Sequence, residues 1–151
     1  MRHTKTKSGE QGAVLVEMAL MLPLLALIFL TIIDLGLIVR EYQLLQNAAR
    51  EAARYSAQPV NQISRSGTPD ATLADIKQFA VNYAAQEGIT IDLTIDPNYV
   101  QVDQRVEIPG NCGSRITITY PRQILFLGAP FLPVTSITLN AQSVFYNLYG
   151  C

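Results

Sequence analysis

The chain has 151 residues, enough for one small domain together with a membrane anchor. Its 11 Lys and Arg against 12 Asp and Glu give a formal net charge of -1, so no basic excess points to a nucleic-acid partner. Only 15% of the residues are charged, against about 25% in ordinary soluble domains, and this deficit is concentrated in the N-terminal third.

The N-terminal segment has a basic head followed by a long apolar run. Residues 1–12 hold three Lys and Arg against one acid, and residues 13–39 contain only two charged side chains, Glu17 and Asp34. A helix over residues 13–39 is roughly 40 Å long, and about 20 apolar residues suffice to cross a bilayer. We therefore predict a leader over 1–12 and a transmembrane helix over 13–39, with a cytoplasmic N-terminus.

The same residues allow two alternatives to a functional anchor. A cleaved secretory signal peptide has an apolar core of roughly 7–15 residues and a small-residue cleavage site, and this run is longer and lacks such a site at its end. The second alternative is a simple signal anchor in which Glu17 is incidental. A charge inside a bilayer costs roughly 2.5–3.5 kcal/mol. Because an incidental charge would carry this cost without benefit, a functional role for Glu17 is favoured.

Two further residues of the apolar run have a simple and a functional interpretation. Pro23 removes one helix hydrogen bond, which predicts either a plain kink or a weak point that opens when the helix leaves lipid. Asp34 lies roughly 26 Å beyond Glu17 along a helix. We interpret Asp34 as solvated near the outer membrane interface, in preference to a member of an intramembrane charge pair.

The helix is expected to continue as an amphipathic segment over residues 40–57. Apolar and small residues recur there at the three- and four-residue spacing of one helix face. They are Leu44, Leu45, Ala48, Ala49, Ala52, Tyr55 and Ser56. Small side chains permit close approach, and packing on the chain's own domain is favoured over packing on a partner helix.

Residues 58–151 are predicted to form an extracytoplasmic α+β domain. After a loop, a second helix begins near the capping residue Thr72 and runs to about Gln86, with Gly88 as its stop. Alternating apolar and polar residues then predict an antiparallel sheet of about four strands. The predicted strands are Ile89–Ile95, Tyr99–Ile108, Ser114–Tyr120 and Val134–Tyr149.

Two features of this domain suggest contacts. The connection over residues 121–133 is apolar and contains Phe126 and Phe131, so it either covers the core or forms an exposed patch that docks a partner. Cys112 and Cys151 are too far apart in sequence for a CxxC motif. In an exported domain a disulfide between them is favoured over two free thiols.

Residues 12–23, GAVLVEMALMLP, follow the basic head and resemble the signal of type IV pilins and pseudopilins. More narrowly they resemble the TadE-like family of the tight-adherence pilus system. The acidic residue and glycine at Asp34-Leu35-Gly36 and the phrase QNAAREAARY at residues 46–55 strengthen this resemblance. Met18 departs from it, because many pilins have an aromatic residue there.

The resemblance implies a pilin-like fold and several roles. A prepilin peptidase would cut between Gly12 and Ala13 on the cytoplasmic face, and Glu17 would neutralise the new amine of a neighbouring subunit and so set the assembly register. The implied partners are this peptidase, other pilin subunits and the pilus assembly machinery. The implied location is the bacterial inner membrane, with the domain on the periplasmic side or in a pilus.

The sequence shows no catalytic set. Its single histidine, His3, lies in the leader, and the carboxylates Asp92, Asp96, Asp103 and Glu107 are interpreted as a solvated sheet face. We therefore predict a protein that is not an enzyme and takes no cofactor, metal or small-molecule substrate. The leading hypothesis is a pseudopilin acting in assembly of a tight-adherence type pilus or related secretion system. The alternatives are a membrane-anchored periplasmic binding or scaffold domain with no filament role, and an enzyme that uses carboxylates alone.

Overall fold

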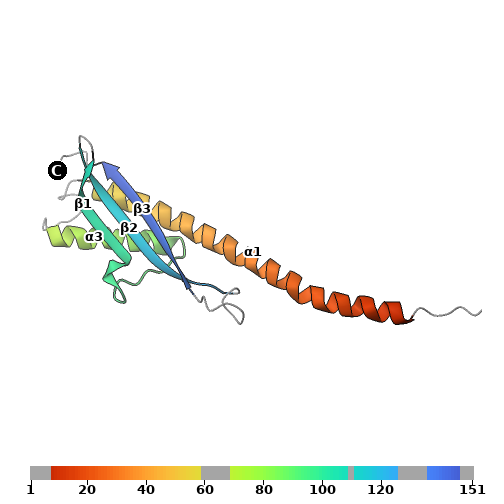
Figure 1. The fold of residues 1–151 in the computed structure, drawn as a ribbon. Helices are drawn as coiled ribbons and strands as arrows, with labels where there is room; N and C mark the ends of the chain where they lie inside the picture. The colour runs from red at the N-terminus through yellow and green to blue at the C-terminus, as the bar shows by residue number, and fades with distance from the viewer. Residues whose placement is uncertain (1–7, 59–68, 109–110, 126–135, 147–151) are drawn as a thin grey trace, which may run out of the picture.

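A computed structural model of the chain describes residues 8–58, 69–108, 111–125 and 136–146, and Figure 1 shows its fold. In chain order the elements are helix α1 (Ser8–Ser56), helix α3 (Pro69–Gln86), the short 3-10 helix η1 (Pro97–Tyr99) and strands β1 (Val100–Ile108), β2 (Asn111–Gln123) and β3 (Ser136–Tyr146). This arrangement confirms the α+β class, with three strands among the described residues where about four were predicted.

Helix α1 is the longest element and extends beyond the domain. Its 49 residues correspond to roughly 74 Å. The helix continues through Pro23 and is bowed in Figure 1. Its C-terminal half lies behind the sheet, whereas its N-terminal half projects away from every other described element.

The sheet is an antiparallel meander in the order β1-β2-β3. Strands β2 and β3 pair without interruption from Gly113 opposite Tyr146 to Gln123 opposite Ser136. Strands β1 and β2 have a register irregularity between Asp103 and Val106. The two outer strands of the sheet therefore differ in regularity.

Strand β2 continues past its predicted end at Tyr120 and includes Pro121. A proline cannot donate a ladder hydrogen bond and is confined to edges and bulges. Strand β1 pairs with β2 only as far as Ile118, so at Pro121 β2 has β3 as its one paired neighbour among the described strands. The missing N–H is tolerated because β2 is locally an edge strand there.

The prediction of a strand at Ile89–Ile95 is wrong. This segment is irregular, and the backbone N–H and the hydroxyl of Thr94 donate to Asp92 Oδ1 at 2.8 and 2.6 Å. Ile89 and Ile91 are nevertheless buried, at 3% and 4% exposure. The alternation at Ile89 and Ile91 therefore reflects burial on one side of the segment and not strand pairing, and it does not extend to Ile95, which is 73% exposed.

The second helix begins earlier than predicted and ends as predicted. It begins at Pro69, so Thr72 lies within α3, fully buried, and is not its capping residue. At the other end Gly88 has a φ of +87°, and the N–H of Ile89 donates to the carbonyl of Ala84 at 2.9 Å. This is the αL termination in which a glycine is favoured because it has no side chain.

The core lies between the sheet and the two helices, and the packing of the α1 stripe on its own domain is confirmed. Tyr55 of α1 stacks on Phe79 of α3 with ring centroids 4.3 Å apart. The buried apolar residues that form one cluster are Leu45, Ala48, Ala49, Ala52, Ala53, Ile76, Ala80, Ala84, Ile89, Ile91, Val100, Ile116, Ile118, Leu139 and Ala141.

Candidate functional site

The candidate site is the projecting N-terminal half of α1. Its large apolar side chains face outward, from Val14 at 58% exposure through Leu25 at 67% to Ile32 at 60%. Exposed apolar surface of this extent marks a membrane or protein interaction site. The part of α1 from Gly12 onward contains a stretch long and apolar enough to cross a membrane, and only 6% of that stretch is buried in the fold.

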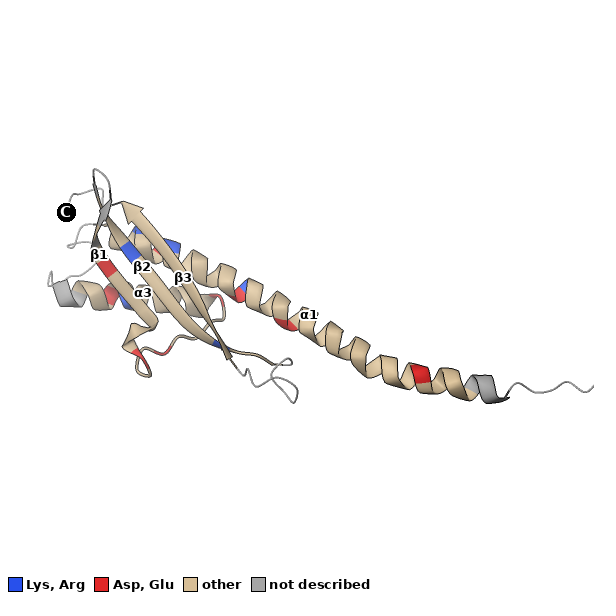
Figure 2. Ribbon diagram, viewed as in Figure 1, with Lys and Arg blue, Asp and Glu red and all other residues tan. Residues whose placement is uncertain are grey.

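Polar groups within this half are few. Thr31 satisfies its hydroxyl internally, because its Oγ1 donates to the carbonyl of Leu27 at 2.8 Å. Glu17 is exposed on the helix surface and is the one charged residue between residues 12 and 34. Figure 2 shows that the projecting half of α1 is mostly uncharged. A carboxylate in this position requires a partner or solvent whenever the helix enters an apolar environment.

The predicted processing site lies near the start of α1. Helix α1 begins at Ser8, so Gly12 and Ala13 lie within its first two turns. A β-carbon at Gly12 would meet no atom within 4 Å beyond the adjoining backbone of the helix, and the same holds for Gly36 further along the helix. The chain's own fold therefore does not require glycine at either position.

Asp34 lies in surroundings that differ from those predicted for it. Its side chain is 1% exposed, although its neighbours Ile33 and Leu35 are 39% and 52% exposed. Asp34 also has an interaction partner within the fold. The expectation that solvent or headgroups surround Asp34 is therefore wrong: the protein itself covers this carboxylate where the apolar half of α1 ends.

One ion pair joins α1 to the sheet just beyond the apolar half. Arg122 Nη1 on β2 lies 2.9 Å from Glu41 Oε1 on α1, with side-chain exposures of 16% and 18%. The second oxygen of Glu41 and Nε of Arg122 are buried without a hydrogen-bond partner. No local pattern in the sequence predicts this pair, because Arg122 is predicted to lie in a connection between strands and the contact depends on the tertiary fold.

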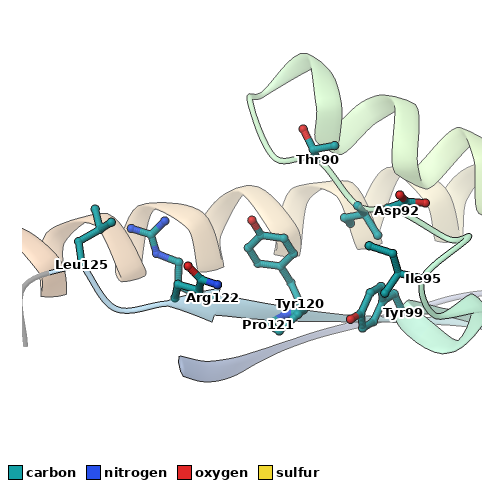
Figure 3. Close-up of a pocket in the computed structure, with 10 residues that line it drawn as sticks. Thr90, Asp92, Ile95, Tyr99, Tyr120, Pro121, Arg122 and Leu125 are labelled. Carbon is teal, nitrogen blue, oxygen red and sulfur yellow. The ribbon is translucent and has the colours of Figure 1, made fainter. Parts of the chain in front are cut away.

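A cavity of about 400 Å³ opens beside this ion pair (Figure 3). Tyr99, Tyr120 and Arg122 line it together with the segment after α3, which contributes Thr90 and Asp92. The hydroxyl and then the backbone N–H of Thr94 lower the pKa of Asp92 below its usual value. Such a carboxylate is ionised near neutral pH and cannot serve there as a general acid.

The remaining predicted site residues are separated from this region or lie outside the described residues. Asp92 and Asp96 lie in turns and not on a sheet face, and Asp96 Oδ1 accepts a hydrogen bond from the N–H of Asn98 at 2.8 Å. Among the described residues, no group of three His, Cys, Asp or Glu could hold a metal ion. Cys112 lies on β2. Its proposed partner Cys151, and both Phe126 and Phe131, lie outside the described residues.

The fold and the exposed helix define a class of protein: a small α+β domain on one N-terminal apolar helix, which indicates a single-pass membrane protein. The family model described as TadE-like protein matches residues 12–54 and confirms the resemblance over that segment. This segment is less than a third of the 151 residues and lies within α1. No curated protein and no solved structure matches the chain.

Proposed function

We propose that this chain is a pseudopilin or minor pilin-like membrane protein that acts in assembly of a tight-adherence type pilus or a related secretion system. One observation carries the proposal: the segment matched by the TadE-like model is a single helix whose first half is exposed and apolar. That half is suited first to lipid and then to neighbouring helices of an assembly. The proposed location is the bacterial inner membrane, with the N-terminus in the cytoplasm and the domain outside.

The proposed processing step is cleavage between Gly12 and Ala13 by a prepilin peptidase. Since α1 begins at Ser8, the peptidase would have to unwind its first turns to reach this bond. Helix ends open at low free-energy cost, and a glycine lets a protease approach the backbone closely. Cleavage would remove three Lys and Arg and one Glu, which changes the formal side-chain charge from -1 to -3.

The proposed assembly step uses Glu17 and the new amine of Ala13. Two opposite charges are tolerated in an apolar environment when they are paired, and an unpaired one is strongly unfavourable. The exposed carboxylate of Glu17 is accessible to the amine of a neighbouring subunit. Only alignments that bring the two together leave no buried charge without a partner, so Glu17 would set the assembly register.

In the oxidising compartment outside the membrane, we also propose a disulfide between Cys112 and Cys151. It would attach the C-terminus of the chain to β2. Disulfides persist in such compartments. If the bond forms, the intact mass of the purified chain without reductant is lower by two hydrogens than its mass after reduction.

The processing step is tested by the intact mass of the chain expressed with and without a prepilin peptidase. The expected product begins at Ala13 and appears only with the peptidase. Gly12→Ala should block cleavage without disturbing the fold, because no atom lies near the added methyl group. Gly36→Ala is the matched control, equally free of contacts, and should be processed normally. An uncleaved wild-type chain would instead favour a membrane-anchored binding or scaffold domain with no filament role.

A further inference from the structure

The cavity beside the Glu41–Arg122 ion pair has apolar side chains exposed at its rim. Leu125, just after β2, is 56% exposed, and Ile95, in the segment between α3 and η1, is 73% exposed. Both line the cavity of about 400 Å³ together with Tyr99 and Tyr120 (Figure 3). The proposed function uses neither this cavity nor its rim.

The direction of β2 places Leu125 level with the end of the apolar half of α1. In Figure 1, α1 and β3 run the same way, and β2 is antiparallel to β3, so β2 runs toward the apolar half of α1. Arg122 lies opposite Glu41, and the three residues that follow it extend up to about 10 Å beyond this pair. The seven residues from Glu41 back to Asp34 also span about 10 Å of helix. Leu125 therefore lies close to the level of Asp34.

When α1 spans a bilayer, this level is the outer boundary of the hydrocarbon core. A core of about 30 Å takes about 20 helical residues, and 20 residues counted from Ala13 end at Ile32, just before Asp34. Leu35 and Val39, on the turns of α1 that follow, are still 52% and 55% exposed. These turns of α1 and the rim of the cavity beside them therefore lie at the depth of the lipid headgroups.

The polar side chains of the cavity are suited to this depth. Tyrosine is enriched at membrane interfaces, where its ring meets apolar chains and its hydroxyl meets headgroups. Arg122 Nη1 faces Glu41, and the second amino group of a guanidinium can donate to the phosphate of a lipid headgroup. Glu41 and the ionised Asp92 offset the charge of Arg122, so the lipid requires a phosphate but no net negative charge.

We propose that a phospholipid of the outer leaflet binds at this end of the domain. Its headgroup occupies the cavity beside Tyr120 and Arg122, and its acyl chains lie against Leu125 and the exposed side of α1. The inference goes beyond pilus assembly and rests on the proposed function only for the anchoring of α1 in a membrane.

Photo-cross-linking tests the headgroup site in the full-length chain, in vesicles of phosphatidylethanolamine and phosphatidylglycerol. The photoreactive residue p-benzoylphenylalanine replaces Tyr120, which lines the cavity. The matched control has the same replacement at Tyr146, the last residue of β3, which is 55% exposed. After irradiation the intact mass should show a gain of one phospholipid at Tyr120 and none at Tyr146. A gain at neither position, or an equal gain at both, would overturn the headgroup site.

Tryptophan quenching tests the depth of the rim independently. The chain contains no tryptophan, so a single introduced tryptophan is observed without background. Leu125→Trp and Val144→Trp replace apolar side chains that are 56% and 42% exposed, the second near the end of β3. In vesicles of lipids brominated at the start of the acyl chains, Leu125→Trp should lose most of its fluorescence and Val144→Trp should lose none. No quenching of Leu125→Trp, or equal quenching of the two, would contradict contact with lipid.

The two proposals fail in different ways. Vesicle flotation and circular dichroism first verify that each variant is folded and in the membrane. Absence of the cross-link or of the quenching in this floated protein would overturn the lipid site, whether or not the chain is processed. A wild-type chain that a prepilin peptidase never cleaves would contradict the proposed function and leave both lipid measurements unchanged.

Discussion

The two halves of α1 form one continuous helix and require different surroundings. In the N-terminal half large side chains such as Leu15, at 71% exposure, face outward. In the C-terminal half Ala48, Ala49, Ala52 and Ala53 are fully buried against the sheet and α3. Side-chain size, more than hydrophobicity, separates the halves: small residues let the helix approach the domain closely, whereas large ones present area to lipid or to other helices.

The substitution with the largest expected effect tests the assembly role of the exposed half of α1. Glu17→Ala should leave membrane insertion intact, because it removes an unfavourable charge, and should abolish co-assembly with partner subunits. Co-purification of tagged and untagged subunits measures this. Glu51→Ala, the same substitution in the domain half of α1, is the control and should assemble normally. Normal co-assembly of Glu17→Ala would contradict the register role.

A matched pair of substitutions tests the packing difference directly. Ala52→Leu should lower the free energy of unfolding of the domain by about 1–3 kcal/mol, because the buried site has no room for three more carbons. Ala19→Leu, in the exposed half, should change it by less than about 0.5 kcal/mol. Denaturant unfolding of the full chain in detergent, followed by tyrosine fluorescence, provides the values. Equal effects would show that the halves do not differ in packing.

A smaller effect is expected at the junction between the halves. Glu41→Gln, Arg122→Gln and the double variant form a cycle whose coupling should be roughly 1 kcal/mol, because the pair is only partly shielded from water. Glu41 Oε2 and Arg122 Nε are buried without a hydrogen-bond partner, and this cost limits the net stabilisation that the ion pair contributes. The same unfolding measurement applies. A coupling near zero would mean that hydrophobic packing alone holds β2 to α1.

The smallest effect lies in the domain, at Asp92. Its pKa is below the usual 3.8 because Thr94 donates two hydrogen bonds to the carboxylate. A depressed pKa in the folded state contributes stability above pH 3.8, and this contribution is lost as the pH falls through the folded-state pKa. Carbon-13 NMR titration of the Asp92 carboxyl should show the depressed pKa, and Thr94→Val should raise this pKa part of the way to 3.8, because the substitution removes the hydroxyl donor and keeps the backbone N–H. An ordinary pKa of Asp92 in the wild-type chain would contradict the hydrogen bonds from Thr94 to its carboxylate.

The sequence was a good guide to α1 because both of its signals are local. A long apolar run and a three- and four-residue spacing of small residues each follow from the helix period alone. The stop at Gly88 was predictable for the same reason, since a glycine termination depends on neighbouring residues. The start at Pro69 was missed because proline at the first helical position competed with a plausible cap at Thr72.

Contacts between distant segments were not predictable. The alternation at Ile89–Ile95 indicated a strand, because burial on one side, as at Ile89 and Ile91, produces the same pattern whether or not a neighbouring strand is present. Asp34 was visible as a charge in an apolar run, yet its burial depends on protein that covers it in the fold. The Glu41–Arg122 pair joins elements far apart in the chain and has no local signature.

The continuity of α1 has a consequence for the orientation of the domain. An α-helix turns by roughly 100° and rises by roughly 1.5 Å for each residue. The domain packs directly on the second half of this helix, without a described linker between the halves. A slip of one residue in how the first half aligns with its neighbours would therefore rotate the domain by more than a right angle about the helix axis. The direction in which each surface of the domain faces, including the edge of β3, is therefore set by how the apolar half of α1 aligns with its neighbours inside the membrane.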